Sequence, residues 1–571
     1  MDIKLIRNLS LGGLIILVIS LFYYQVIKGD MYLNRAQANY IRVVSKEAIR
    51  GTILDRNYET LAYDRGAFNI AVIPYQIKDN KEELFSKISR LAKVKKETLT
   101  INYNRNFRSP FYPVDILIDI DKEKALALKE ELGEEVIIEE IPQRHYPFGK
   151  ELAHILGYVK RGVNVSNNSD VYGYIPYQRV GLAGIEKYYN NYLAGRDGGE
   201  LLEVDALGKI AGFLGANHPK KGKDIVLTID LRLQRIAYQL LSEYKRGVII
   251  VMDPRDGQIH VFCSQPSYEP NQIMRGVDFD SILKAEDNIL LNRGIQARYP
   301  LGSVFKPILS IAGLEEKKIT SNTTFICEGR YRLGNLSFEC RSAHGKQNLI
   351  EALAHSCNVY FYNVGAILDI DKIAKWAKKF GLNTLTGIDL PYEKSGIVPD
   401  QHWKITNIKS PWFKGDTLNV SIGQGYLEAT PLEVLVAISA FANGGYLVKP
   451  HLVKEIEGEN ISLSPSKFLD LSLSHINEVK KGLEAVVSWS NGTAHLLDTL
   501  KLSIAGKTGT AQTIGKSHGW FVGFFPSSSP KYSICVFLEN VGSSSEAVKV
   551  AYDFLKEAKN KGIISQEEIK R

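Results

Sequence analysis

The stretch ARYPLGSVFKPILSIAGL, residues 297–314, places a serine and a lysine three positions apart at the head of an apolar run. On a first helical turn Ser303 and Lys306 would share one face, because residues i and i+3 are neighbours on a helix surface. That arrangement suits a nucleophile and its base, although an N-cap followed by a solvated lysine is the more usual meaning. The same spacing recurs at Ser242/Lys245, Ser464/Lys467 and Ser528/Lys531. The pair alone therefore predicts no chemistry.

Two further motifs make the pair specific. Ser356-Cys357-Asn358 opens an apolar helical stretch, and Lys507-Thr508-Gly509 falls within a predicted strand. Ser-x-Asn recurs at Ser166/Asn168, whereas Lys-Thr-Gly occurs once in the chain. Ser-x-x-Lys, Ser-x-Asn and Lys-Thr-Gly, in this order and on these elements, are the signature of serine enzymes that react with penicillin.

Composition excludes several other classes of protein. The chain has 571 residues, enough for more than one domain, with 44% hydrophobic and 23% charged residues. Its five cysteines are too few and too scattered for a disulfide framework. The net charge of +8 includes no concentrated basic run with interleaved aromatics, so we expect no nucleic-acid partner.

The N-terminus predicts a membrane anchor. Residues 8–27, NLSLGGLIILVISLFYYQVI, carry no charge and as a helix would span the ~30 Å hydrocarbon core. Lys4 and Arg7 precede this run and no small-residue cleavage site closes it, which favours an uncleaved signal anchor with residues 1–7 in the cytoplasm. A cleaved signal peptide is the alternative. In both cases the bulk of the chain is exported.

The rest of the chain predicts an α+β protein with two regions. Over residues 28–222, short apolar strand-like runs alternate with charged helical stretches. The second region, 223–571, begins with a hairpin signal in GVIIVMDPRDGQIHVFCS (247–264). It ends with three strand-like runs between 502 and 540 and a helical stretch at 546–560. We expect one antiparallel sheet built from both ends of this region, with helices packed on it.

The chain resembles class B penicillin-binding proteins of the elongation type, the penicillin-binding protein 2 family, over nearly its whole length. The segments that carry the resemblance are LLNRGIQARYPLGSVFKP, SCNVYFYNVG, SIGQGYLEATPLE, GKTGTAQT, HGWFVGFFP, RGTILDRN, RHYPFG, GLAGIEKYYNNYLAG and EVDALGK. The resemblance implies a peptidoglycan D,D-transpeptidase of the bacterial cytoplasmic membrane, with a single span at 8–27. It also implies a pedestal domain at 28–222 and an extracytoplasmic transpeptidase domain at 223–571.

Three positions depart from the pattern of that family. Leu301 replaces the usual second proline, Val304 the usual threonine, and Tyr58 a glycine. We expect Val304 to remove only a hydroxyl on the helix surface, without loss of activity.

The resemblance also assigns roles to the motif residues. Ser303 attacks the D-Ala-D-Ala bond, Lys306 is its base, Ser356 relays a proton to the leaving D-Ala, and Asn358 binds Lys306 and a substrate carbonyl. Lys507, Thr508 and Thr510 bind the terminal carboxylate, and Gly509 lets the peptide lie along the strand. The N–H groups of Ser303 and Thr510 form the oxyanion hole.

Lys306 must lose its proton to act as a base. At an ordinary pKa of ~10.4, a neutral lysine at pH 7 costs about 4.6 kcal/mol. We therefore expect burial and the positive charge of Lys507 to lower the pKa of Lys306.

Other activities remain open at this stage. A D,D-carboxypeptidase or a β-lactamase would use the same residues and admit water, and a β-lactam sensor would need a signalling domain that the seven residues before the span cannot hold. Catalysis needs no metal or organic cofactor. The expected partners are stem peptides, β-lactams, the membrane and a SEDS-type glycan polymerase.

The polymerase would contact residues 9–27 and the pedestal. Five charged residues of the first region suit a fixed ion-pair junction, for which internal bracing is the alternative; they are Arg50, Asp55, Arg56, Arg144 and Glu186.

Four potential metal ligands fall within one segment of the second region. They are Cys327, Cys340, His344 and Cys357. The set suits a structural zinc, although its spacing matches no common finger pattern. The alternative is a Cys327–Cys340 disulfide, with His344 on the surface and Cys357 buried as a small apolar residue. We expect the other two cysteines, Cys263 and Cys535, to pack in core strands.

Overall fold

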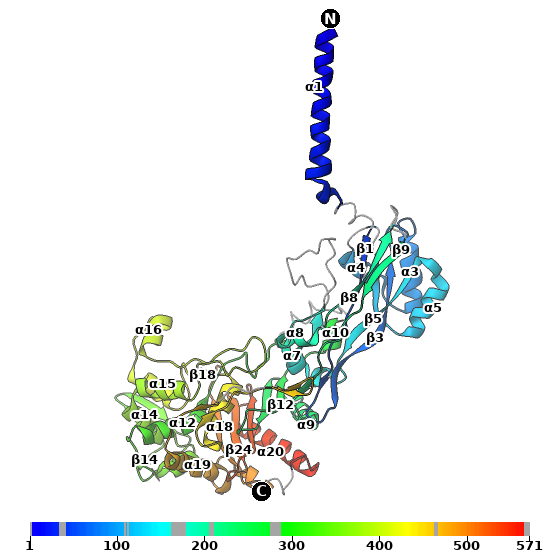
Figure 1. Ribbon diagram of the computed structural model, residues 1–571. Coiled ribbons are helices and arrows are strands. Elements are labelled where there is room, and N and C mark those ends of the chain that lie inside the picture. The colour runs from blue at the N-terminus through cyan, green and yellow to red at the C-terminus, as the bar shows by residue number, and fades with distance from the viewer. Residues whose placement is uncertain are drawn as a thin grey trace.

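The computed structural model describes residues 3–33, 41–107, 110, 113–160, 179–204, 210–274, 287–461 and 466–564. A long N-terminal helix stands apart from a strand-rich region, which leads into a helix-covered sheet (Figure 1). The helix α1 (Ile3–Phe22) continues into the π-helical turn η1 (Tyr23–Ile27). The most apolar 18-residue window of this 25-residue stretch has a mean hydropathy of 2.1, and none of its residues is buried in the protein. By length and composition, they are a candidate membrane span, as the sequence predicts.

The strand-rich region, here called the pedestal, contributes strands to two larger sheets and also contains the short antiparallel pair β6-β7. An antiparallel sheet of order β1-β8-β9 lies nearest the N-terminal helix (Figure 1). In the larger sheet the long strand β3 pairs with β2, β4 and β5, while α3, α4 and α5 cover an apolar core. The pedestal elements are β1 (Ile41–Lys46), β2 (Ile53–Leu54), β3 (Thr60–Val72), α3 (Lys81–Ala92), α4 (Lys96–Asn106), β4 (Val114–Ile120), α5 (Lys122–Leu132), β5 (Ile137–His145), α6 (Ala153–Leu156), β6 (Val159–Lys160), β7 (Val180–Gly181), α7 (Gly184–Tyr188), α8 (Asn190–Leu193), β8 (Gly198–Val204) and β9 (Ile210–Asn217).

One sheet joins the pedestal to the second region. Strand β10 (Ile225–Leu227) pairs in parallel with β2 of the pedestal. On its other side, β10 pairs antiparallel with β20 (Val453–Ile456), which in turn pairs with β21 (Glu459–Asn460). Because strands from both regions share backbone hydrogen bonds, the two regions are continuous at this point.

The second region is built on a five-stranded antiparallel sheet of order β12-β11-β25-β24-β23. The strands are β11 (Gly247–Met252), β12 (Ile259–Gln265), β23 (Ala505–Ala511), β24 (His518–Phe525) and β25 (Tyr532–Leu538). The first two and the last three come from opposite ends of the region. The prediction of an α+β fold with this sheet is therefore confirmed.

Helices cover both faces of this sheet, which explains why its strands are continuously apolar. On β11, Val248 and Ile250 point into the core that contains α12, α14 and α18, while Ile249 and Val251 point into the core beneath α9 and α20. The helices and short strands of the region are α9 (Leu231–Leu241), α10 (Pro270–Met274), β13 (Tyr299–Pro300), η4 (Gly302–Phe305), α12 (Lys306–Glu315), β14 (Phe325–Cys327), β15 (Arg330–Leu333), β16 (Leu336–Glu339), β17 (Gly345–Gln347), α13 (Leu349–Ala354), α14 (Asn358–Leu368), α15 (Ile370–Lys379), α16 (Gln401–Ile408), α17 (Lys414–Ser421), β18 (Glu428–Ala429), α18 (Pro431–Ala442), β19 (Tyr446–Leu447), β22 (Lys467–Phe468), α19 (Leu473–Ser488), η5 (His495–Leu500) and α20 (Ser544–Asn560). Cys263 and Cys535 are buried in the two cores, as predicted.

A buried ion-pair network braces the pedestal. Glu186 accepts from Arg50 at 2.7 Å and from Arg144 at 2.6 Å, and all three side chains are at most 1% exposed. Asp64 pairs with Arg144 at 3.4 Å and with Arg179 at 2.8 Å. Burial alone would raise the pKa of Glu186, but Arg144 and Arg50 outweigh burial and hold it below its ordinary value. These charges therefore compensate one another inside the pedestal.

Two of the five predicted junction residues lie outside this network. Asp55 accepts hydrogen bonds from the N–H groups of Asn57 and Glu59, so it shapes a turn. Arg56 instead contacts the ring of His260 on β12. Their inclusion in an ion-pair junction was wrong, because the chain after β2 lies against the second region: the Arg56 N–H donates to the Ile229 carbonyl, and Asp55 accepts the Leu231 N–H.

Replacing Glu186 by glutamine should destabilise the pedestal by about 3–5 kcal/mol, since it leaves buried arginines uncompensated. The readout is faster hydrogen exchange of β3 and β5 amides in the full-length protein. Because the pKa of Glu186 is lowered on folding, its contribution is present above about pH 4.3 and is lost as the pH falls below that value.

Glu83→Gln is the matched control, because Glu83 pairs with Lys87 on the exposed face of α3 at 2.9 Å. Its effect should stay below about 1 kcal/mol. Equal exchange in the two variants would contradict the bracing role of Glu186.

Candidate active site

The three predicted motifs line one cavity of about 420 Å³. Ser303 lies in the short helix η4, Ser356 and Asn358 at the start of α14, and Thr508 and Thr510 on β23. The lining residues are Ser303, Glu339, Cys340, Arg341, Ser356, Asn358, Ile422, Gln424, Thr493, Thr508, Thr510, Gln512, Ser517, Ser543 and Ser544. Segments that are 200 residues apart in sequence thus contribute side chains to a single site.

Glycines allow the turn that carries Ser303 to approach β23 closely. Gly302 has φ +56°, and a Cβ there would lie 2.7 Å from the Thr510 carbonyl oxygen. A Cβ on Gly509 would lie 2.9 Å from the Leu301 carbonyl oxygen and 3.0 Å from Val304. Gly509 is therefore required by the packing of the Ser303 turn, a reason that the sequence did not predict.

The same contact corrects the expectation for Val304. Its side chain is fully buried. The position is part of the core between η4 and β23, so Val304 contributes apolar packing and does not merely delete a hydroxyl from the helix surface.

Lys306 is fully buried one turn after Ser303. Its amine lies 2.8 Å from the Ser356 carbonyl oxygen, 2.8 Å from Asn358 Oδ1 and 3.2 Å from Ser356 Oγ. A neutral amine has two N–H groups for the first two oxygens and a lone pair that can accept from the hydroxyl. Among the described residues, no carboxylate pairs with Lys306. The surroundings therefore suit the neutral form.

Burial lowers the pKa of Lys306 to about 8, against opposing contributions from Cys357 and Cys340. For Lys507, burial and then repulsion from Lys306 lower the pKa well below its ordinary value. The expectation that Lys507 lowers the pKa of Lys306 is therefore not met: burial lowers the pKa of Lys306, and the repulsion between the two lysines lowers the pKa of Lys507. At a pKa of about 8, the neutral form costs about 1.4 kcal/mol at pH 7.

Ser356 has a strained backbone. Its φ is +54°, in the left-handed region that favours glycine. This conformation turns its carbonyl and its hydroxyl toward the amine of Lys306 at the same time. Strain of this kind is typical of functional sites, where the surroundings hold it in place.

Strand β23 lies at the edge of the sheet, and β24 is the one described strand that pairs with it. Lys507 is buried and donates to the Thr508 carbonyl at 3.1 Å. Thr508 donates its hydroxyl to Thr493 at 2.8 Å. The open edge and these hydroxyls provide a surface on which an extended peptide could add by backbone hydrogen bonds.

Comparison with known proteins places this geometry in a family. Residues 247–557 match the penicillin-binding protein transpeptidase domain, and residues 45–227 match the penicillin-binding protein dimerisation domain. The chain belongs to the penicillin-binding protein transpeptidases. It is 32% identical to the peptidoglycan D,D-transpeptidase MrdA of Haemophilus influenzae over 93% of this chain and 87% of that protein.

Solved structures of the family agree with the fold. Penicillin-binding protein 2 of Helicobacter pylori, in a complex with MreC, is 30% identical with a TM-score of 0.81 and covers 92% of this chain and 100% of that chain. A chain of a peptidoglycan synthase complex that coordinates polymerization and crosslinking is 28% identical with a TM-score of 0.70, covering 99% of both chains. The resemblance to the penicillin-binding protein 2 family is therefore confirmed.

The serines of two other Ser-x-x-Lys pairs, Ser242 and Ser528, are not among the residues that line this cavity. Ser242 ends α9 in an exposed position, where its hydroxyl donates to Gln239, and Ser528 lies exposed after β24. Ser464 lies outside the described residues, as does Ser166 of the second Ser-x-Asn.

Sequence reasoning missed four residues that line the cavity with useful polar groups. Gln424 donates to the Thr510 carbonyl at 3.3 Å, and Thr493 accepts from Thr508. Glu339 and Arg341 flank Cys340. Gln424 lies in SIGQGYLEATPLE, one of the segments that carry the family resemblance, so the sequence could have indicated it. Thr493, Glu339 and Arg341 belong to no motif.

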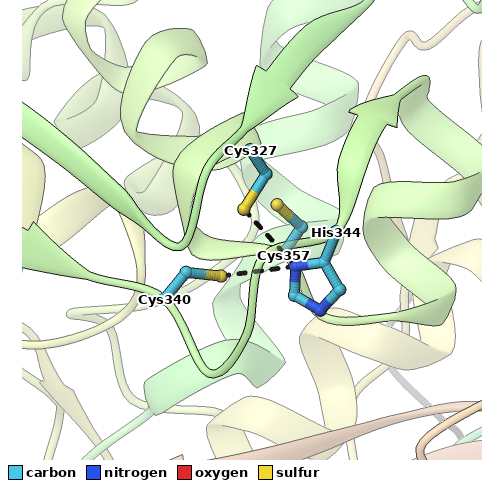
Figure 2. A group of neighbouring side chains, drawn as sticks. All are labelled: Cys327, Cys340, His344 and Cys357. Atoms are coloured by element: carbon cyan, nitrogen blue, oxygen red, sulfur yellow. Dashed lines mark hydrogen bonds between the residues drawn. The ribbon is translucent and has the colours of Figure 1, made fainter.

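The four predicted metal ligands lie close together at the start of α14. Figure 2 shows their side chains pointing toward one another, and their ligand atoms all lie within 4.8 Å of each other. The His344 ring lies 3.5 Å from the sulfurs of Cys327 and Cys340, and Cys340 accepts the Asn358 N–H at 3.2 Å. All five cysteines are free thiols, so the Cys327–Cys340 disulfide is absent from this structure.

The donor set fits zinc. Three sulfurs and one imidazole nitrogen are a common tetrahedral set for structural zinc. A hydrogen bond from Cys357, together with the N–H groups of Val359 and Asn358, lowers the pKa of Cys340 and outweighs its burial. The thiolate form that a metal requires is thus favoured at Cys340.

Proposed function

We propose that the protein is a serine D,D-transpeptidase that cross-links peptidoglycan stem peptides during cell elongation. The observation that carries the proposal is the buried Lys306, which has no balancing carboxylate among the described residues, follows Ser303 by one turn and donates to the Ser356 carbonyl. Family membership and the name of the Haemophilus influenzae relative support the reaction class.

In the first step Ser303 forms an ester with the penultimate D-Ala. The neutral amine of Lys306 takes the hydroxyl proton as Ser303 Oγ bonds to the carbonyl carbon. The peptide C–N bond then breaks, and the D-Ala nitrogen takes up a proton through the Ser356 hydroxyl, which is 3.2 Å from Lys306. Lys507, Thr508 and Thr510 hold the terminal carboxylate, and the N–H groups of Ser303 and Thr510 stabilise the oxyanion.

In the second step an amine of a neighbouring stem peptide attacks the ester carbonyl. A C–N bond forms, the ester C–O bond breaks, and the proton from the amine returns to Ser303. Asn358 keeps Lys306 oriented through both steps, because its Oδ1 accepts from the amine at 2.8 Å. No metal takes part in either step.

We also propose how the protein is placed and with what it assembles. Residues 1–7 face the cytoplasm, 8–27 cross the bacterial cytoplasmic membrane, and the pedestal (28–222) and transpeptidase domain (223–571) are extracytoplasmic. The apolar helix supports the span, since none of its residues is buried in the protein. The partner is a SEDS-type glycan polymerase that contacts the span and the pedestal. The similarity to a chain of a synthase complex supports this assembly.

The thiol–imidazole cluster holds a structural zinc in this proposal. Cys327, Cys340, His344 and Cys357 supply the four ligands. The metal braces the segment that carries Ser356, because Cys357 lies between Ser356 and Asn358 in sequence. It also fixes the β14–β17 segment against α14.

The nucleophile assignment predicts that labelled penicillin forms an ester on Ser303, located by peptide mass spectrometry. Ser303→Ala should abolish labelling, and Lys306→Ala should slow it by about a hundred- to ten-thousand-fold through loss of the base. Ser528→Ala is the control and should label normally. Adducts on Ser242 or Ser528 in the Ser303→Ala protein would refute the assignment.

The zinc assignment predicts stoichiometric zinc in the full-length protein purified without added metal, measured by elemental analysis. Cys340→Ala should lose the metal because it removes one of four ligands, whereas Cys263→Ala should retain it because Cys263 is buried in the other core of the sheet. Zinc-free wild-type protein with an oxidised Cys327–Cys340 pair would contradict the assignment.

A further inference from the structure

Two opposite charges face the active-site cavity from the segment between β16 and β17. Among the described residues that line the cavity, Glu339 is the one carboxylate and Arg341 the one guanidinium. Glu339 ends β16 and Arg341 follows two positions later, just beyond the strand, and both residues line the same cavity. Their long side chains can therefore reach one small ligand between them.

Neither side chain forms an ion pair with another described residue of the protein. In the part of the chain that the structure describes, Arg341 makes no ion pair or side-chain hydrogen bond, and it is exposed. Glu339 is also exposed, and its Oε1 accepts from the Ser337 hydroxyl at 2.8 Å. Arg330 faces Glu339 across the β15–β16 hairpin, but no ion pair joins them in the described structure. Exposed charges of this kind add little to stability.

The backbone that carries Glu339 and Arg341 is nevertheless bound to the start of α14. Asn358 donates from Nδ2 to the Glu339 carbonyl at 3.1 Å and from its backbone N–H to Cys340 Sγ at 3.2 Å. The Cys340 N–H donates to the Gly329 carbonyl at 2.8 Å. Because Asn358 also binds Lys306, the backbone that carries the two charges is held close to Lys306.

The two charges do not match the needs of the donor peptide. The donor's terminal carboxylate already has Lys507 and the hydroxyls of Thr508 and Thr510 on β23. The acceptor arrives instead as an ammonium, since free amines have pKa values of about 8–10. A carboxylate in the cavity attracts an ammonium, and a guanidinium beside it binds a second carboxylate in bidentate fashion.

We propose that Glu339 and Arg341 select the acceptor: a stem peptide whose nucleophilic amine lies next to a free carboxylate. This inference rests on the proposed transpeptidase function and names the chemistry of its second substrate. Glu339 receives the amine end, and Arg341 pairs with the neighbouring carboxylate. Acceptors that carry an amide in place of that carboxylate are disfavoured.

The test uses the full-length protein in detergent micelles with a D-Ala-D-Ala-terminated donor peptide. Glycine and glycinamide compete for the same acyl-enzyme, so their product ratio does not depend on the acylation rate. Wild type should favour glycine, and Arg341→Gln should lower the glycine-to-glycinamide ratio by about tenfold, the effect of about 1.4 kcal/mol. Glu339→Gln should lower aminolysis by both acceptors relative to hydrolysis.

Arg332→Gln is the matched control, because Arg332 is an exposed arginine of β15 that does not line the cavity. It should leave the ratio unchanged. An unchanged ratio in Arg341→Gln, or a wild-type acyl-enzyme that releases only the hydrolysis product, would overturn the inference. Penicillin labelling of Ser303 separates the two claims: labelling with an unchanged ratio refutes acceptor selection alone, whereas absence of labelling in wild type refutes the proposed function.

Discussion

The burial of Lys306 without a balancing carboxylate is the constraint on which the catalytic centre depends. A buried ammonium is costly, so the group gives up its proton more readily, and burial lowers its pKa to about 8. Three oxygens lie within hydrogen-bond distance of its nitrogen. Two are carbonyl acceptors, and the third is the Ser356 hydroxyl, which can accept from the nitrogen or, when the amine is neutral, donate to its lone pair. The left-handed backbone of Ser356 is what places two of these oxygens together.

Close packing around this lysine explains several features that look unrelated in the sequence. The turn that carries Ser303 reaches β23 only because Gly302 and Gly509 have no side chains. The side chain of Val304 packs against Gly509 in the same contact. Cys340 then connects the β14–β17 segment to Asn358. The proposed metal ligand Cys340 and the charged residues Glu339 and Arg341 therefore share one short stretch of backbone that contacts Asn358. A change in any one of them should therefore be felt at the others.

Much of this could be predicted from the sequence, and the failures have physical reasons. The three motifs, the hairpin at 247–264 and the terminal strands are local signals. They predicted the fold, and the structure places residues of all three motifs around one cavity. The burial of Val304 and the reason for Gly509 depend on segments 200 residues apart, which no local pattern records. Asp55 and Arg56 are charged in the same way as the residues of the buried ion-pair network, so composition could not separate them. Which residues they contact depends on the pairing of β2 with β10.

The pH dependence of Ser303 acylation by penicillin tests the central claim most directly. Second-order rate constants are measured from pH 6 to pH 10 on the full-length protein, with Ser303→Ala as the blank. A base with a lowered pKa predicts a rate that rises with pH, passes its midpoint near pH 8 and levels off above it. A rate that is flat across this range, or that is still rising without a plateau at pH 10, as expected for an ordinary lysine of pKa about 10.4, would contradict the account.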